Sequence, residues 1–384
     1  ACTLQGCAAA LPQDARHSLP PPNAITGGCL LGSECRCSDG CCEGTNPMHE
    51  CTHESAAGSG RRFLPMCSEC LVQVSPPGLE LLPRFNDHAG LTRRYLRLVQ
   101  QTVLNTAYED FESADFDTLR ALTMVGPRRL DNIDALIQDV LIRGVPGHFI
   151  ECGCWRGGAS LFAAAAFAVY DALPLPFETG KKSERLVFLA DSFDGLPPVD
   201  VTQFPADQAH VGTDAIAVLK ENSVELVERA AKALDVDKRT RFVPGFFNES
   251  LPRAIADGTF ASQDRSSSSG VVYSGFFSIL RLDGDLYQSA IEALHYLYPL
   301  LSVGGHIVVD DFTDWSGTRA AIFDYRDRHG LEEPIQITWH DLTVDPERGE
   351  LTRGIWWTKN TQVGYHPLKD RVVYSEGSVK LPPH

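Results

Sequence analysis

The segment from Phe149 to Ser160 constrains the fold of this chain more than any other. Apolar residues at 147–150 predict a buried strand that ends at Glu151, and the alanine-rich segment 159–170 predicts a helix. The turn between them contains three glycines, Gly153, Gly157 and Gly158. A carboxylate at a strand end, a glycine turn and a helix N-terminus together predict a nucleotide-binding corner at the carboxyl edge of an α/β sheet.

The spacing of this corner is Glu-x-Gly-x-x-x-Gly, and Trp155 occupies the place where Gly-x-Gly-x-x-Gly requires its second glycine. That glycine allows the backbone to approach a pyrophosphate, so the sequence disfavours a dinucleotide. Glycine turns between a strand and a helix also serve packing, and the corner alone therefore does not identify the ligand.

Composition excludes several classes of protein. The net charge of −16 disfavours nonspecific binding to nucleic acid, because an acidic surface repels phosphate backbones. The longest apolar run, 161–170, is too short to cross a membrane. The sequence shows no signal-peptide pattern, so we expect a cytoplasmic protein; because residue 1 is Ala, it stays open whether further residues precede it.

Cysteine divides the chain into two regions. Ten of the 12 cysteines precede residue 71, and residues 1–78 are rich in Pro, Gly and Ser without apolar periodicity. We expect an appendage here, joined by a linker at Pro76–Gly78. A flexible segment, a zinc site around Cys67 and Cys70, and a set of disulfides all remain open for it.

Residues 79–146 predict a helical cover that precedes the sheet. A first helix is expected over 91–105, with its buried stripe at Leu91, Tyr95, Leu98, Val99 and Leu104. A second is expected over 130–143, with Ile133, Leu136, Ile137, Val140 and Leu141 on one face.

Residues 147–360 predict a Rossmann-like α/β domain. After the first strand, further strands are expected at 186–190, 241–245, 276–282 and 306–309, separated by helices. The segments 335–339 and 354–357 predict a C-terminal antiparallel hairpin on an otherwise mostly parallel sheet. The serine-rich segment 262–275 predicts a surface insertion, and 361–384 a tail.

Acidic residues follow most of these strands. Asp191 ends the second strand, where a carboxylate can accept hydrogen bonds from a ribose diol. Asp283 ends the fourth strand, and Asp310 and Asp311 end the fifth. Crowded carboxylates repel one another unless a cation neutralises them, and oxygen ligands favour magnesium. Alternatively, Asp310 and Asp311 only end a strand and cap the next helix.

Taken together, these stretches resemble the TylF/MycF family of macrocin-type O-methyltransferases, which use the class I S-adenosylmethionine (SAM) fold. The motifs that carry the resemblance are Asn105-Thr-Ala-Tyr108, Thr123-Met-Val-Gly126, Arg129-Leu-Asp-Asn132, Glu151-x-Gly-x-Trp-Arg-Gly-Gly158, Ala190-Asp-Ser-Phe-x-Gly-Leu-Pro197, Leu280-Arg-Leu-Asp-Gly-Asp-Leu-Tyr287, Leu297-Tyr-Pro-x-Leu-Ser-x-Gly-Gly305 and Asp310-Asp311. The resemblance covers about residues 95 to 359. Leu122 departs from the family, which usually has His there, and this departure puts the acceptor in doubt.

The resemblance implies a SAM- and magnesium-dependent enzyme that methylates a hydroxyl of a sugar or secondary metabolite. Asp283, Asp310 and Asp311 are then the metal ligands, and Asp283 is also the best-placed base. The implied cofactor residues are Tyr108, Met124, Glu151, Gly153, Trp155, Arg156, Gly157, Gly158, Ser160, Asp191, Ser192 and Phe193. Alternatives are a catechol or phenol O-methyltransferase and a noncatalytic SAM-binding protein. The expected partner is a small hydroxylated acceptor, with neither nucleic acid nor membrane, and a homo-oligomer stays open.

Overall fold

The computed structural model describes residues 36–38, 41–43, 89–107, 120–172, 184–211, 219–220, 222–260, 276–310, 312–338, 354–370, 373–375 and 378–380. The chain divides into two compact units, Ala1–Leu81 and Leu82–His384. The described part of the first unit is an antiparallel hairpin of β1 (Arg36–Ser38) and β2 (Cys41–Glu43). Apart from this hairpin, the cysteine-rich appendage lies outside the described residues, and the three alternatives for its structure lie there with it. The predicted insertion 262–275 also lies outside the described residues.

The second unit contains the predicted alternation of strands and helices. Its strands are β3 (His148–Cys152), β4 (Val187–Asp191), β5 (Thr240–Pro244), β6 (Phe277–Leu282), β7 (Leu301–Val309), β8 (Gln336–Ile337), β9 (Ile355–Thr358), β10 (Val373–Ser375) and β11 (Ser378–Lys380). Its α-helices are α1 (Ala89–Val103), α2 (Pro127–Ile142), α3 (Gly158–Ala172), α5 (Val224–Ala233), α6 (Phe247–Ala256), α7 (Tyr287–Leu297) and α8 (Ser316–Arg328). The short 3-10 helices in the described ranges are η4 (Pro205–His210), η5 (Asp237–Arg239) and η6 (Tyr298–Leu300).

The main sheet has the order β5-β4-β3-β6-β7-β9-β8. Strands β3 to β7 are mutually parallel, whereas β9 runs antiparallel to both β7 and β8. This confirms the predicted parallel sheet with a C-terminal antiparallel hairpin. The chain leaves β3 towards β4 and later returns on its other side with β6, so the crevice between these strand ends is the expected ligand position.

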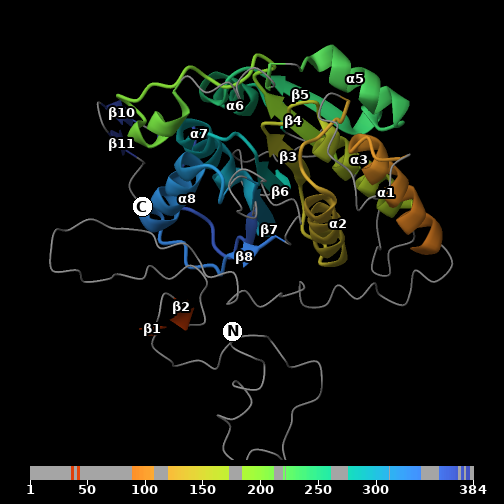
Figure 1. The fold of residues 1–384 in the computed structure, drawn as a ribbon, viewed down its shortest axis with the longest axis horizontal. Helices are drawn as coiled ribbons and strands as arrows, with labels where there is room; N and C mark the ends of the chain where they lie inside the picture. The colour runs from red at the N-terminus through yellow and green to blue at the C-terminus, as the bar shows by residue number, and fades with distance from the viewer. Residues whose placement is uncertain are drawn as a thin grey trace, which may run out of the picture. The chain divides into compact units, whose positions relative to one another are not determined.

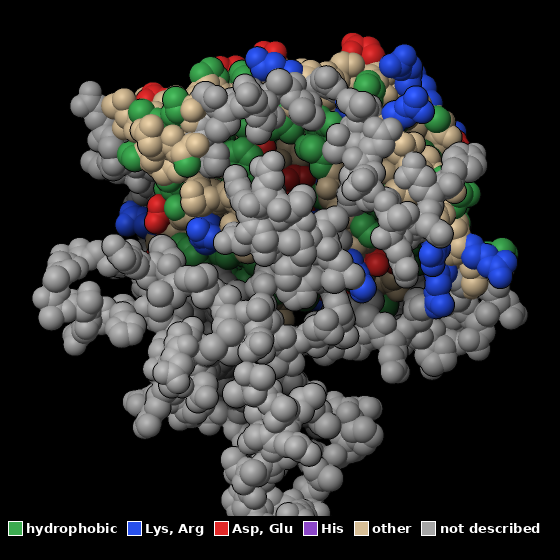
Figure 2. All heavy atoms as spheres, viewed as in Figure 1, with side chains coloured by type: hydrophobic (Ala, Val, Ile, Leu, Met, Phe, Trp, Pro, Cys, Tyr) green, Lys and Arg blue, Asp and Glu red, His purple; other side chains and the backbone are tan. Residues whose placement is uncertain are grey.

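Helices cover both faces of this sheet (Figure 1). Helices α1, α2, α3 and α5 lie on one face, and α6, α7 and α8 lie on the other. In the view of Figure 2, acidic side chains lie at the bottom of a hollow bordered by hydrophobic side chains. Within the described ranges, no helix combines the length and the apolar character needed to cross a membrane.

Helix α1 exists as predicted, but the predicted buried stripe is partly wrong. Leu91, Tyr95 and Leu98 are exposed, whereas Leu96 and Val103 are buried. The helix carries two neighbouring apolar stripes, and packing against α3 selects the stripe that contains Leu96, Val99 and Val103. For α2 the prediction is confirmed, with Ile133, Leu136, Ile137 and Val140 all buried.

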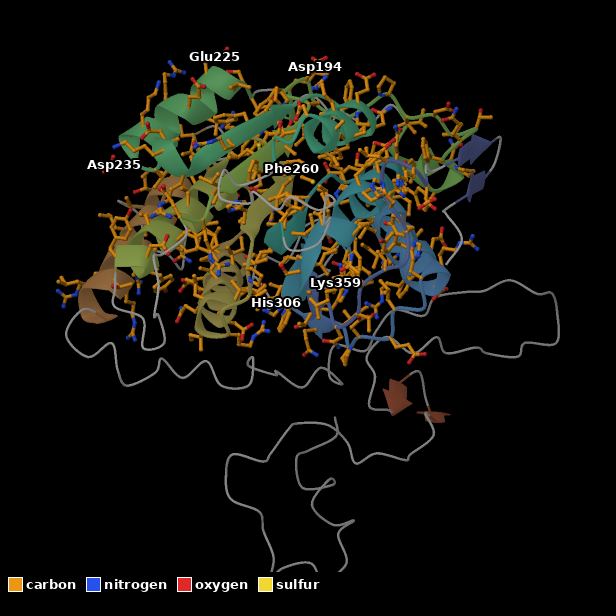
Figure 3. All side chains as sticks on the ribbon, turned by 180° about the vertical axis from the view of Figure 1, so that it is seen from behind. Asp194, Glu225, Asp235, Phe260, His306 and Lys359 are labelled. Carbon is orange, nitrogen blue, oxygen red and sulfur yellow. The ribbon has the colours of Figure 1, made fainter. Side chains whose placement is uncertain are left out.

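Buried polar residues form hydrogen bonds that connect the C-terminal strands to neighbouring elements (Figure 3). His306 on β7 is buried, and its Nε2 lies 2.6 Å from Asp139 on α2. Lys359, which follows β9, donates from Nζ to the carbonyl oxygens of Tyr298 (2.7 Å) and Leu301 (2.8 Å). Burial lowers the pKa of Lys359 to about 7. These bonds hold α2 and β9 against β7.

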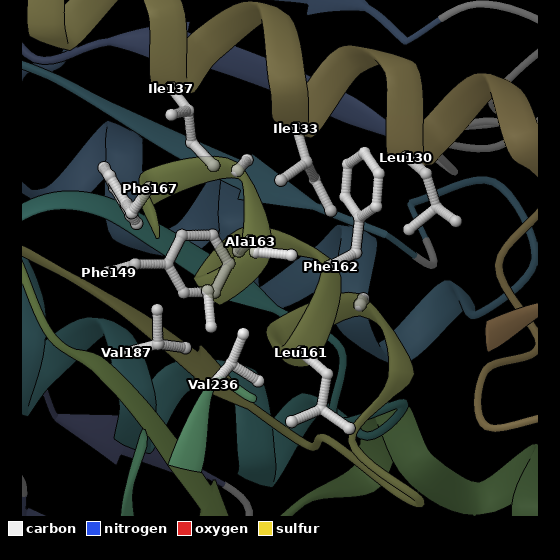
Figure 4. Packing of buried hydrophobic residues seen from close by; sticks show 14 of the residues in the cluster. Leu130, Ile133, Ile137, Phe149, Leu161, Phe162, Ala163, Phe167, Val187 and Val236 are labelled. Atoms are coloured by element: carbon white, nitrogen blue, oxygen red, sulfur yellow. The ribbon is translucent and has the colours of Figure 1, made fainter. Parts of the chain in front are cut away.

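The hydrophobic core on the α3 side fixes the helix that begins at the glycine corner (Figure 4). Phe162 and Phe167 of α3 pack with Ile133 of α2 and with Phe149 of β3. Burying each such side chain contributes about 1.5–3 kcal/mol. Residues 158–167 of α3 are all buried, because this helix lies between the sheet and helices α1 and α2.

Three glycines bring the chain segments of the corner into close approach. A Cβ on Gly153 would overlap the carbonyl oxygen of Asp283, so this glycine lets the ends of β3 and β6 meet. A Cβ on Gly157 would lie 2.5 Å from Val227 Cγ1, and one on Gly158 would lie 2.6 Å from the carbonyl carbon of Leu122. Part of the glycine pattern therefore serves packing of the protein against itself.

This close approach predicts a large difference between two glycine-to-alanine variants. Gly153 and Gly258 both have a left-handed φ, +88° and +76°, but a Cβ on Gly258 would meet nothing within 4 Å. Gly258→Ala should lower the free energy of unfolding by about 1–2 kcal/mol, the backbone cost alone. Gly153→Ala should lower it by about 3 kcal/mol or more, because overpacking adds to that cost. Urea denaturation measures both, and equal losses would contradict the assigned contact.

Candidate active site at the carboxyl edge of the sheet

Asp191, at the end of β4, organises the glycine corner. Its Oδ2 accepts hydrogen bonds from the backbone N–H groups of Cys154 (2.8 Å) and Trp155 (3.0 Å). Its Oδ1 accepts from the N–H of Phe193 at 2.8 Å. Burial raises the pKa of Asp191, although these donors act in the opposite direction. The hydrogen bonds that Asp191 accepts therefore hold the turn that the sequence predicts to lie beside a cofactor.

Trp155 and Arg156 complete the turn. Trp155 has a φ of +46°, a left-handed conformation that non-glycine residues rarely adopt. Asn222 Nδ2 lies 3.4 Å from both the carbonyl oxygen of Trp155 and Asp191 Oδ1. The Arg156 guanidinium lies 4.3 Å from the Trp155 ring centroid and donates to the carbonyl oxygen of Ala121 at 3.1 Å. These contacts tie the turn to the loop before α2.

Glu151, at the end of β3, is buried beside this turn. Its carboxylate accepts a hydrogen bond from Ser160 on α3 and forms an ion pair with Arg281 on β6. Burial raises the pKa of Glu151 to about 7, against the lowering effect of Arg281. The structure thus brings the predicted cofactor residues Glu151 and Ser160 into direct contact.

Arg281 links the predicted cofactor and metal residues. Besides Glu151, its Nη1 lies 2.5 Å from Asp283 Oδ2 and its Nη2 lies 2.6 Å from Asp310 Oδ1. The side chain of Arg281 is only 1% exposed. The three carboxylates stand at the ends of three neighbouring strands, as predicted, but the cation among them is an arginine that the sequence prediction did not include.

Asp310 is held by two arginines. Arg129 on α2 pairs with its Oδ2, while Arg281 pairs with its Oδ1. Burial opposes the ionisation of Asp310, but both ion pairs outweigh it and hold the pKa of Asp310 below its ordinary value. Asp310 is therefore a buried carboxylate in charged form, and the alternative that it only caps a helix does not describe these contacts.

The remaining predicted site residues lie in different settings. Ser192 and Phe193 belong to the turn after β4, where Ser192 Oγ donates to the carbonyl oxygen of Gly195 at 2.5 Å. Met124 is 46% exposed, in the loop that Gly158 approaches. Tyr108 and Asp311 lie outside the described residues. Burial raises the pKa of the Cys152 and Cys154 thiols, which disfavours a redox role.

The described part of the structure does not show the predicted magnesium site. Among the residues that the structure describes, no three His, Cys, Asp or Glu side chains form a metal-binding group. The donor chemistry nevertheless fits a hard cation, since the available ligands are carboxylate oxygens. Asp283 is the most accessible of them, with 23% of its side chain exposed, whereas both oxygens of Asp310 already face arginines.

Arg129 and Arg281 are the site residues that sequence reasoning missed. Arg281 lies inside an apolar strand, Phe-Ser-Ile-Leu-Arg-Leu, where a charge requires a partner. That placement was a usable signal. Arg129 begins the motif Arg129-Leu-Asp-Asn132, but the helix sequence does not indicate its partner, which is 181 residues away.

The family model described as "Macrocin-O-methyltransferase (TylF)" matches residues 113–260 and 270–343 of this chain. Mycinamicin III 3''-O-methyltransferase of Micromonospora griseorubida is 30% identical, over 69% of this chain and 96% of its own length. Demethyldecarbamoylnovobiocin O-methyltransferase of Streptomyces niveus is 30% identical, over 74% of this chain and 98% of its own.

A third relative matches a shorter part of the chain. It is 8-demethyl-8-(2,3-dimethoxy-alpha-L-rhamnosyl)-tetracenomycin-C 4'-O-methyltransferase of Streptomyces olivaceus, 35% identical over 56% of this chain and 71% of its own. Among solved structures, that of the O-methyltransferase NovP matches with a TM-score of 0.55 and 28% identity. The match covers 70% of this chain and 100% of NovP.

The contacts of Asp191 predict a specific defect in Asp191→Asn. An amide places an N–H group against one of the backbone donors, so we expect the free energy of unfolding to fall by about 1–3 kcal/mol. The exposed Asp194 lies three residues further in the same turn, and Asp194→Asn is the matched control with little expected change. Chemical denaturation compares the two, and equal stability of both variants would show that Asp191 does not hold the turn.

Proposed function

Because the chain belongs to the macrocin O-methyltransferase (TylF) family and is therefore an O-methyltransferase, we propose that it transfers the methyl group of SAM to a hydroxyl of a sugar in a secondary metabolite. The names of its relatives support this acceptor class, since one of them specifies 4'-O-methylation of a rhamnosyl-tetracenomycin. The observation that carries the proposal is the ordered set of acids Glu151, Asp191, Asp283 and Asp310 at the ends of β3, β4, β6 and β7.

The proposed cofactor site is the corner between β3 and α3. Glu151 and Ser160 offer it a polar wall, and the turn held by Asp191 offers the backbone. Trp155 at the second glycine position keeps the backbone further from a phosphate, which favours SAM over a dinucleotide. Tyr108 and Met124 complete the proposed site from the segment that precedes α2.

The proposed mechanism assigns the proton to Asp283. Methyl transfer is an in-line displacement in which the C–S bond breaks as the new C–O bond forms, so the acceptor oxygen must lie behind the methyl carbon. The hydroxyl proton passes to the Asp283 carboxylate, which Arg281 holds at 2.5 Å and which is 23% exposed. The products are the methyl ether and S-adenosylhomocysteine (SAH).

We propose Asp283, Asp310 and Asp311 as the magnesium ligands. Carboxylate oxygens are the ligands that magnesium prefers, and the Asp283 carboxylate, with 23% of its side chain exposed, is the most accessible of the described ones. When bound, magnesium lowers the pKa of a hydroxyl and orients it.

Methyl transfer itself is tested with labelled SAM and a panel of acceptors. We expect label to appear in glycosylated secondary metabolites that carry a free sugar hydroxyl, detected by mass spectrometry. A catechol in the same panel tests the alternative acceptor class. Transfer to the catechol alone would overturn the proposed sugar acceptor while leaving the methyltransferase intact.

Chelation tests the magnesium part. EDTA should abolish turnover and added magnesium should restore it, while SAM binding persists because the Glu151 corner needs no metal. Asp283→Asn should reduce kcat by about 100-fold or more, since a positioned base contributes about that factor. Asp194→Asn, an exposed carboxylate elsewhere on the same strand edge, should leave turnover unchanged. Full turnover in EDTA would exclude the metal, and a fully active Asp283→Asn enzyme would exclude the base.

A further inference from the structure

Arg281 is a buried cation beside the proposed site of SAM, a cofactor that is itself a cation. Its guanidinium is 1% exposed and contacts three carboxylates, those of Glu151, Asp283 and Asp310. The burial is enforced by the sheet, since β6 lies between β3 and β7 and all six of its residues are buried.

The strand register explains why one side chain reaches all three acids. Arg281 pairs directly with Glu151 on β3 and with Val308 on β7. Asp283 and Asp310 stand two residues beyond Arg281 and Val308, so the alternation of a strand keeps them on the same face of the sheet. The contact is therefore set by backbone pairing, not by a flexible surface arrangement.

The described residues of this network carry charges of both signs, and Glu151, whose pKa burial raises to about 7, carries only part of a negative charge near neutral pH. Arg281 and Arg129 supply two positive charges against the three carboxylates. Removing Arg281 would take one positive charge out of this buried network. Because the network is buried, such a change acts on a nearby ligand with little screening by solvent.

The charge of this network matters for the reaction, because the reaction changes the charge of the cofactor. SAM carries a positive sulfonium, whereas the sulfur of the product SAH is neutral. A strongly negative site would stabilise the sulfonium in the ground state, and that stabilisation is lost as the positive charge disperses in the transition state. A fixed cation beside the acids would limit this effect and would also weaken binding of a divalent metal.

We propose that Arg281 is a positioning residue that acts as the resident counter-cation of the site and sets its affinity for cationic ligands. Its ion pairs position the three carboxylates, and its positive charge weakens their attraction for the sulfonium of SAM and for a metal ion. The inference rests on the proposed function, because it takes SAM to bind beside Glu151.

Calorimetric titration with SAM, SAH and magnesium tests the role in the parent protein and in two variants. Arg281→Gln should raise the ratio of SAM affinity to SAH affinity by roughly threefold to tenfold and should tighten magnesium binding. Turnover should fall in the same variant. Arg281→Lys keeps the charge, so its ratio should stay within about twofold of the parent. The ratio is informative because general damage to the fold weakens both ligands alike.

A role confined to folding would give a different result. If Arg281→Gln weakens SAM and SAH equally and leaves their ratio unchanged, the proposal is wrong. If Arg281→Gln does not fold, Asp283→Asn decides, because it removes a negative charge from the same network at a partly exposed position. Its SAM-to-SAH ratio should fall below that of the parent and of Asp194→Asn, and an unchanged ratio overturns the proposal.

The parent protein separates this inference from the function on which it rests. If the parent binds SAM but no magnesium, only the metal part of the proposed function fails, and the SAM-to-SAH ratio still decides the role of Arg281. If the parent binds neither SAM nor SAH, the proposed function and this inference are both overturned.

Discussion

The ion pairs of one buried guanidinium connect the strand ends at the carboxyl edge of the sheet, where the candidate site lies. Arg281 joins carboxylates at the ends of β3, β6 and β7, and Arg129 adds a helix to the same network through Asp310. Breaking a buried network of this kind by removing one partner is costly, because the remaining charges stay buried. The same residues therefore support the fold and, in our proposal, set the electrostatics of the site.

Close packing gives this network its geometry. The ends of β3 and β6 meet only because Gly153 has no side chain where the carbonyl oxygen of Asp283 lies. On the other side of the corner, Asp191 accepts hydrogen bonds from the N–H groups of Cys154 and Trp155, so the protein's own contacts hold the turn. Such preorganisation lowers the ordering cost of binding and suits a reaction that depends on alignment.

Much of the fold and part of the site follow from the sequence. Parallel strands end at a common edge, so locating the strands was enough to place Asp191, Asp283 and Asp310 together. The arginine partners were not predicted: a charge inside the apolar strand β6 indicates that Arg281 has a partner but not which acids it contacts, and Arg129 is 181 residues from Asp310. Similarly, local periodicity could not decide which apolar stripe of α1 is buried, since that choice depends on its packing against α3. Tyr108 and Asp311 lie outside the described residues and remain predictions.

The central claim is that the corner between β3 and α3 is built for SAM and not for a dinucleotide. Isothermal titration of the purified chain with SAM and with NAD tests it most directly. The account predicts saturable binding of SAM and no binding of NAD, because Trp155 replaces the glycine that a pyrophosphate requires. Binding of NAD without binding of SAM would contradict it.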